Sequence, residues 1–190
     1  MSWMILVYLL SFFTPITESP TQENVLVLEE TDFDVCLSKD ERELIKLVNE
    51  YRRKRRLTPI KVSASLSYVA QKHTKEMQHD FKDITHSWVG CKYKGSNPKT
   101  YGCMQDMPKK LTGYPGAGFE CAFAQYGAKF SAAEVLQGWK DSRPHNNVIL
   151  NRDVWKQLKW DAMGVSIYGN YAAIWFGEET DPKGTPNTCK

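Results

Sequence analysis

The pattern near the end of the chain constrains the fold most. Met163, Val165 and Ile167 alternate with small or polar residues, the period of a strand with one buried face. Gly169 and Asn170 then form a pair typical of a two-residue turn, and an apolar run over residues 171–176 returns. The sequence therefore predicts an antiparallel β-hairpin across residues 163–176.

Three helices are predicted before this hairpin. Ser38 and Glu41 have the spacing of a capping box at the start of the first helix. The apolar residues that follow at helical spacing are Leu44, Leu47, Val48 and Tyr51. A second helix is predicted over about residues 65–79, and a third over about residues 131–141, stopped by Pro144. Helices followed by an antiparallel hairpin indicate the α+β class.

The N-terminal segment reads as a targeting signal. Residues 3–13 are apolar and uncharged, too short a run to span a bilayer comfortably, and residues 14–19 offer a cleavage region. No Lys or Arg precedes the run, so an uncleaved anchor is the alternative. We expect a signal peptide over residues 1–19, a flexible acidic leader over 20–35 and a single domain over 36–190. The expected location is extracellular, with no transmembrane span after removal of the signal.

Five cysteines in an oxidising compartment suggest two disulfides and one remaining thiol. Cys91 and Cys103 flank a short loop and are expected to pair. Cys36 and Cys189, near the two ends of the folded region, are expected to join the termini. Cys121 is then free; the alternative is that all five are reduced and buried.

The charge pattern excludes some partners and suggests another. A formal net charge of +3 is too small to indicate nucleic acid. One basic run closes the first predicted helix, and it consists of Arg52, Arg53, Lys54, Arg55 and Arg56. Cations stabilise a helix C-terminus, so a solvated helix end is the simpler interpretation. Weak contact with an anionic surface, either a heparin-like glycan or anionic lipid, is the alternative.

Residues 90–118 are rich in Gly, Pro, Asn and Lys and are predicted to form a long loop region. Aromatic residues in and after this region form a candidate wall for an apolar groove. They are Tyr101, Tyr114, Phe119, Phe123, Tyr126 and Phe130. The alternative is that most of these rings fill the core.

Several short motifs, in this order along the chain, resemble the CAP superfamily of cysteine-rich secretory, antigen 5 and pathogenesis-related proteins. Asn49 to Arg52, with the turn from Leu57 to Ile60, resembles the opening helix of the family and the turn after it. His86-Ser87 resembles its "H-S" element, and Gly118 to Cys121 its "G-E-N" element with one extra residue. Val135 to Trp139 resembles its "V-x-x-W" helix.

The most specific motif comes next. The run from Ser142 to Asn151 is very similar to the bacterial form of the family, in which "S-x-x-H" precedes "I-L-N". Residues 163–165 and 175–177 resemble its closing strands. The resemblance covers about residues 38–178 and implies a three-layer α-β-α sandwich around a small antiparallel sheet.

The resemblance also implies a cleft that gathers histidines and acidic residues. Carried over to this chain, it offers His86, Glu120 and His145 as metal ligands or catalytic candidates. Ser142 stands where animal and plant members commonly have Glu, and the eukaryotic "G-H-Y-T-Q" element is absent, so the cluster is incomplete by that pattern. His73, on or near the apolar stripe of the second helix, is interpreted as a core or boundary residue.

Three uses of this cluster are open. Two neutral imidazoles are good ligands for Zn²⁺, and a carboxylate can complete the coordination or orient an imidazole. A histidine beside a carboxylate can also transfer protons. Alternatively, the three residues form a buried polar network that ties loops together. Cys121, as a nucleophile beside histidines, is a weaker interpretation than a structural cysteine.

Together these features favour a secreted, non-enzymatic protein that binds a lipid, a sterol or an extracellular protein, with a cleft suited to a divalent metal. A metal-assisted or His/Glu-dependent extracellular hydrolase is the alternative. Toxin members of the family typically carry an extra cysteine-rich C-terminal module. Because this sequence ends at Lys190, soon after the final predicted strand, a channel-blocking toxin is not favoured.

Overall fold

The computed structural model describes residues 33–190. The predicted signal peptide and the leader up to residue 32 lie outside these described residues. Phe33 and Val35, at the end of the segment interpreted as a leader, contact the domain. The Phe33 ring lies 4.7 Å from that of Tyr68, and Val35 is buried.

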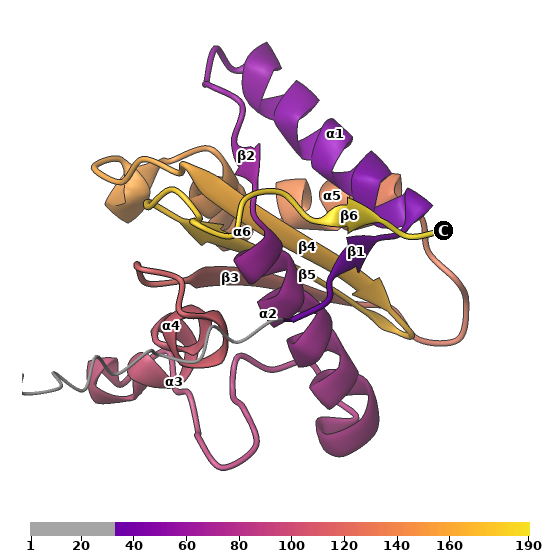
Figure 1. Ribbon diagram of the computed structural model, residues 1–190, viewed down its shortest axis with the longest axis vertical. Coiled ribbons are helices and arrows are strands. Elements are labelled where there is room, and N and C mark those ends of the chain that lie inside the picture. Colours follow the sequence, from indigo (N-terminus) through magenta and orange to yellow (C-terminus); the bar gives the residue numbers. More distant parts are fainter. Residues whose placement is uncertain (1–32) are drawn as a thin grey trace, which may run out of the picture. The chain divides into compact units, whose positions relative to one another are not determined.

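The domain contains a small mixed sheet flanked by helices (Figure 1). The strands are β1 Cys36–Leu37, β2 Lys61–Val62, β3 Phe119–Ala124, β4 Ala162–Tyr168, β5 Tyr171–Gly177 and β6 Asn187–Thr188. The α-helices are α1 Lys39–Lys54, α2 Ala64–Glu76, α3 Gly102–Gln105, α4 Met107–Thr112, α5 Ala132–Asp141 and α6 Arg143–Ile149. The described residues also contain short helical turns at Met77–Phe81, Pro98–Thr100 and Asp153–Trp155.

The main sheet has the strand order β2-β4-β5-β3. Strand β2 is parallel to β4, and the other pairs are antiparallel. The predicted hairpin is confirmed, since β4 and β5 pair up to Tyr168 and Tyr171 with a two-residue turn between them. Gly169 has φ +59°, a left-handed conformation that glycine adopts without strain.

Successive side chains of β5 point to opposite faces of the sheet and pack into two separate hydrophobic cores. Ile174 and Phe176 pack with apolar residues of α1, α5 and α6 on one face. Ala173 and Trp175 pack with α2 and the region of α3 and α4 on the other face. In Figure 1, α2, α3 and α4 accordingly lie on the opposite side of the sheet from α5 and α6. The α+β sandwich implied by the resemblance is confirmed, although the short parallel strand β2 makes its sheet mixed and not purely antiparallel.

The helix starts follow the capping residues. Ser38 accepts from the backbone N–H of Glu41, while the Glu41 carboxylate accepts from the backbone N–H of Ser38. Ser131 and Glu134 form the same reciprocal pair at the start of α5. Both predicted helices therefore begin within one residue of the expected position.

Two details differ from the sequence predictions. Pro144 lies in the first turn of α6, where a missing N–H costs nothing, so a new helix begins at the residue expected only to stop one. The predicted long loop contains α3 and α4. Met104 of α3 and Tyr114, which follows α4, are buried with residues of α2 and β5. This tertiary burial stabilises two short helices that their composition alone did not indicate.

Both predicted disulfides are confirmed. Cys36 pairs with Cys189 beside the β1–β6 ladder, and Cys91 pairs with Cys103, which joins the loop after α2 to α3. Cys121 is free and buried. Among residues 33–190, no helix has the length and apolar character needed to cross a membrane.

Candidate functional site

Glu120 is the centre of the candidate site. It is the second residue of β3, pairs in register with Trp175 of β5, and its side chain has no exposed surface. Oε1 accepts from Nδ1 of His73 at 2.6 Å, and Oε2 accepts from Nδ1 of His86 at 2.7 Å. Because an ionised carboxylate only accepts hydrogen bonds, both Nδ1 atoms carry a hydrogen.

His73 lies on the buried face of α2 and uses both ring nitrogens. Its Nε2 donates to the carbonyl oxygen of Ser87 at 3.0 Å, so Nε2 carries a hydrogen as well as Nδ1. The ring is therefore an imidazolium paired with the Glu120 carboxylate. It stacks on Trp88 at 4.5 Å between ring centroids, a contact that stabilises a cation on an aromatic face.

The electrostatics of this buried pair agree with its hydrogen bonds. Burial opposes a charge on His73, but the charge and hydrogen bond of Glu120 outweigh it and raise the pKa of His73. Burial also favours a protonated Glu120, yet His73 and His86 hold the pKa of Glu120 well below its ordinary value. The site thus holds a buried ion pair at neutral pH.

His86 reaches the same carboxylate from the loop after α2. The loop is fixed by the Ser87 N–H, which donates to Thr85 Oγ1 at 2.9 Å, and by the Tyr93 N–H, which donates to Ser87 Oγ at 3.0 Å. The His86 side chain is 30% exposed, unlike His73. With Nδ1 bound to Glu120, Nε2 is the nitrogen left for a ligand.

His145 enters from α6. It is half-buried, and its backbone oxygen lies 4.0 Å from Sγ of Cys121 on β3. Burial, assisted by the nearby charge of His86 and opposed by that of Glu120, lowers the pKa of His145. His145 is therefore neutral at pH 7 and has a lone pair available. His86 and Glu120 are joined by a hydrogen bond, whereas His145 is linked to them by electrostatic interaction alone.

Comparisons with known proteins agree with this fold. The profile of the cysteine-rich secretory protein family, CAP, matches residues 45–172. The chain belongs to the CAP family. A search of curated proteins finds no significant match.

Three solved structures show the same fold, each covering 74% of this CAP chain. An outer surface protein from Borrelia burgdorferi has 18% identity and a TM-score of 0.55, over 93% of its own length. An extracellular SCP-domain protein from Bacillus anthracis has 22% identity and a TM-score of 0.54. A cysteine-rich secretory protein from Staphylococcus aureus has 19% identity and a TM-score of 0.51. This chain spans 40% and 39% of the latter two proteins.

Sequence reasoning missed the role of His73 in this CAP domain. Its position on the apolar stripe correctly indicated burial, but burial was read as a reason against a place in the site. No strand was predicted at Glu120, so its burial on β3 is known only from the structure. Once that burial is known, a charged or hydrogen-bonding partner is required. The spacing between His73 and Glu120 in sequence gave no hint of contact.

Two expected surfaces are not formed as predicted. The six aromatic residues do not make one groove wall. Tyr114 is buried beside α2, Phe119 contacts Trp155 and Trp160, Phe123 contacts Phe130, and Tyr126 contacts Tyr171. Tyr101 stacks on Tyr93. Their side chains thus pack in separate contacts and do not line a shared cavity.

Arg52 is also not part of an exposed basic run. It is 4% exposed and donates to the backbone oxygens of Thr58 and Ile149 and to the side chain of Asn151. These bonds tie α1 to the end of α6. The remaining four cations of the run, residues 53–56, are exposed.

The described residues form no closed metal site. No group of three or more His, Cys, Asp or Glu side chains within residues 33–190 has the geometry to enclose a metal ion. Both Glu120 oxygens already accept from imidazoles, which gives the carboxylate an orienting role. His86 Nε2 and the neutral His145 ring are the two nitrogens left to bind an ion that water would also ligate.

Proposed function

We propose that this CAP protein is a secreted extracellular binding protein, not an enzyme, and that His86 and His145 bind a divalent metal such as Zn²⁺ beside Glu120. The observation that carries the proposal is the double hydrogen bond of Glu120. It fixes His86 with Nδ1–H on the carboxylate and the Nε2 lone pair free, the tautomer that a metal-binding histidine needs.

The state of the nearby nucleophile candidates supports binding over catalysis. The Ser87 hydroxyl accepts from the Tyr93 N–H, and among the described residues it makes no hydrogen bond to a histidine or a carboxylate. Cys121 is fully buried, and this burial, with the adjacent negative charge of Glu120, raises the pKa of the thiol well above its usual value. A neutral buried thiol is a poor nucleophile.

Secretion is supported by three independent features. Two disulfides indicate an oxidising compartment. The composition of residues 1–19 resembles that of a signal peptide. Two of the similar structures are described as extracellular or secretory.

An extracellular protein is the partner that we favour over a lipid or sterol. The aromatic rings that suggested an apolar groove are divided among separate packing contacts. A protein partner instead requires an exposed surface. Val89 and Ile84 are exposed apolar residues on the loop that carries His86, and they suit such a contact.

The test is a calorimetric titration of the purified protein with Zn²⁺. We expect binding that is lost in both His86→Ala and His145→Ala. His79→Ala is the matched control, because His79 is exposed and lies outside the candidate site, bonded to Tyr168. Absence of binding, or binding indifferent to both substitutions at the site, would remove the metal from the proposal and leave a structural polar network.

A hydrolase remains the second candidate because one observation favours it. The ionised Glu120 orients the partly exposed His86, an arrangement that assists a general base. If this candidate is right, the wild type cleaves extracellular protein substrates and His86→Ala abolishes turnover in a folded protein. Equal turnover in wild type and variant would reject it.

A further inference from the structure

The charge of the described domain differs from that of the whole chain. All 25 Lys and Arg residues lie in residues 33–190, whereas five of the 22 acidic residues precede residue 33. The domain therefore has 25 basic against 17 acidic residues, a formal charge of +8 instead of the +3 of the chain. A surplus of positive charge of this size attracts anionic partners where the basic side chains cluster on one surface.

The end of α1 is one place where the surplus gathers. Arg53, Lys54, Arg55 and Arg56 are exposed, while the buried Arg52 anchors the run to the backbone of the neighbouring segments. Arg56 has φ +62°, so the chain turns sharply away directly after the run. The four exposed cations therefore extend from a fixed helix end.

Lys140 of α5 joins these cations across a groove. Its Nζ lies 5.4 Å from the centre of the Tyr51 ring, and the guanidinium of Arg55 lies 5.5 Å from the same centre. The Tyr51 hydroxyl donates to Asn146 Oδ1 at 3.0 Å, and Asn146 Nδ2 donates to the Lys140 carbonyl at 3.0 Å. One locked aromatic ring thus positions two cations from two helices.

The space between these helices is a groove of about 480 Å³. Its lining includes Lys54, Arg55 and Lys140 with apolar surface from Leu47 and Leu136. Within the described residues, none of these three cations makes an ion pair; the Lys140 ammonium instead donates to Gln137 Oε1. Glu50 is the acidic residue of the lining. We call this feature the α1–α5 basic groove.

We propose that the α1–α5 basic groove binds a sulfated glycan chain. Guanidinium and ammonium groups on both sides of a groove suit sulfate groups spaced along a polymer, and apolar surface between them suits sugar rings. The two disulfides indicate an oxidising compartment, which favours an extracellular polyanion over nucleic acid.

A glycan fits this groove better than an anionic membrane does. Helices that lie on membranes expose large apolar side chains between their cations. The large exposed apolar residues of the described domain are Ile84, Val89, Tyr126, Val154 and Tyr168. None of them belongs to α1 or α5, so the basic groove has no apolar anchor for a bilayer.

The test measures binding of a heparin oligosaccharide to the full chain at physiological salt. Arg55→Gln with Lys140→Gln removes two groove cations and keeps part of each side-chain stem on Tyr51. We expect about tenfold weaker binding, because two exposed ion pairs are lost. Circular dichroism and urea unfolding check that the variant folds as the wild type does.

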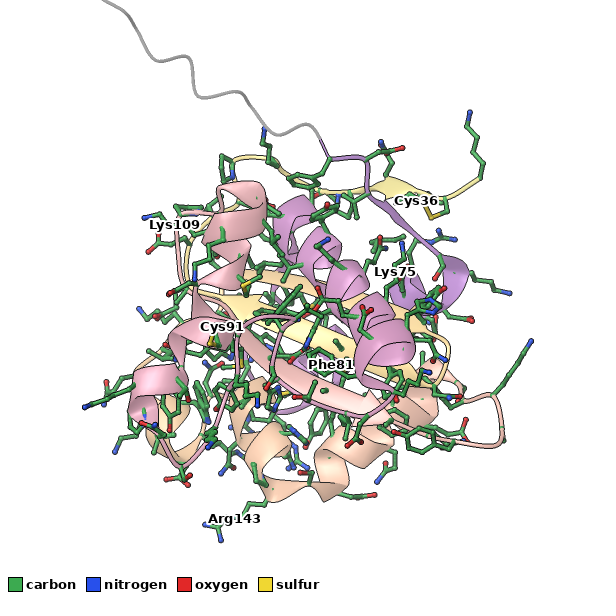
Figure 2. The ribbon with its side chains drawn as sticks, turned by 90° about the horizontal axis from the view of Figure 1, so that it is seen from below. Cys36, Lys75, Phe81, Cys91, Lys109 and Arg143 are labelled. Carbon is green, nitrogen blue, oxygen red and sulfur yellow. A yellow bond between two sulfur atoms is a disulfide. The ribbon has the colours of Figure 1, made fainter. Side chains whose placement is uncertain are left out.

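The matched control is Lys99→Gln with Lys109→Gln, which removes the same charge elsewhere. Both residues are exposed, and Figure 2 shows Lys109, on α4, at an edge of the molecule far from Arg143 at the start of α6. We expect affinity within about twofold of the wild type, because long-range attraction alone is screened by salt.

Three results would overturn the proposal. The first is equal loss in the groove and control variants, which would indicate attraction by the net charge alone. The second is unchanged binding of fully desulfated heparin. The third is no heparin binding together with Arg55- and Lys140-dependent binding to vesicles that contain phosphatidylserine, which would assign the groove to a membrane.

Discussion

Replacing Glu120 by Gln tests whether His73 is a buried cation. The amide keeps the shape of the carboxyl group but removes its charge. Its NH₂ group can donate to Nδ1 of His73 while its oxygen still accepts from His86. His73 would then be neutral, with Nε2–H still donating to the Ser87 carbonyl. The substitution should therefore preserve the fold and abolish the charge.

The sign of the effect follows from the pKa of His73, which is raised in the folded state. Its stabilising contribution is complete below the ordinary histidine pKa of about 6.5 and is lost as pH rises through the folded pKa. Folded wild type then holds up to one proton more than the unfolded chain. Its free energy of unfolding should fall by up to about 1.4 kcal/mol per pH unit above pH 6.5.

Other shifted groups leave part of this pH window clear. The lowered pKa of His145 affects stability below about pH 7.5, and the raised pKa of Cys121 affects it above about pH 8.5. Glu120 has a lowered pKa, so its contribution is complete above about pH 4.3 and is lost only in more acidic solution. Between about pH 7.5 and 8, where the unfolded chain no longer holds the proton of His145, the slope reports on His73.

The assay is urea unfolding of the oxidised protein at several pH values from 6.5 to 8, followed by tryptophan fluorescence. Glu120→Gln should lose most of the slope and be about 2 kcal/mol less stable than the wild type at pH 6.5, with a smaller difference at pH 8. His79→Asn, at an exposed histidine, should retain the slope. Equal slopes in wild type and Glu120→Gln would refute the assignment of the imidazolium.

Three further substitutions test the packing. Gly164→Ala should prevent folding, as judged by circular dichroism, because a Cβ there would lie 2.0 Å from the carbonyl carbon of Leu66 on α2. Arg52→Ala should lower the free energy of unfolding by about 3 kcal/mol, measured in urea, because it leaves buried carbonyl oxygens without a donor. Replacing Cys91 and Cys103 together by Ser should cost about 3 kcal/mol in the same assay, whereas equal stability would show that the loop is held by its packing alone.

Local signals predicted the elements of the fold well. The capping pairs at Ser38 and Ser131 act over three residues, so the sequence alone shows where those helices begin. The two-residue turn at Gly169 likewise fixes the register of β4 and β5. Short-range geometry decides these features, and tertiary contacts reinforce them.

Features that depend on tertiary contact were predicted less well. Arg52 looked like one member of a charged run, but its acceptor in α6 lies 97 residues away. The aromatic residues after the long loop looked like one surface, yet successive side chains of β3 alternate between the two faces of the sheet. Composition identifies such residues as able to be buried, while the topology decides what they contact.

The candidate site was also only partly predicted from the sequence. The motifs that resemble the CAP family indicated His86, Glu120 and His145, because each of these residues lies within such a motif. His73 has none, because on α2 it occupies an ordinary core position. A buried carboxylate on β3, an edge strand of the sheet, nevertheless requires compensation. A single partly exposed imidazole supplies only one of the hydrogen bonds that two carboxylate oxygens accept. Burial of Glu120 therefore calls for a second donor, and in the structure the His73 ring of α2 supplies it.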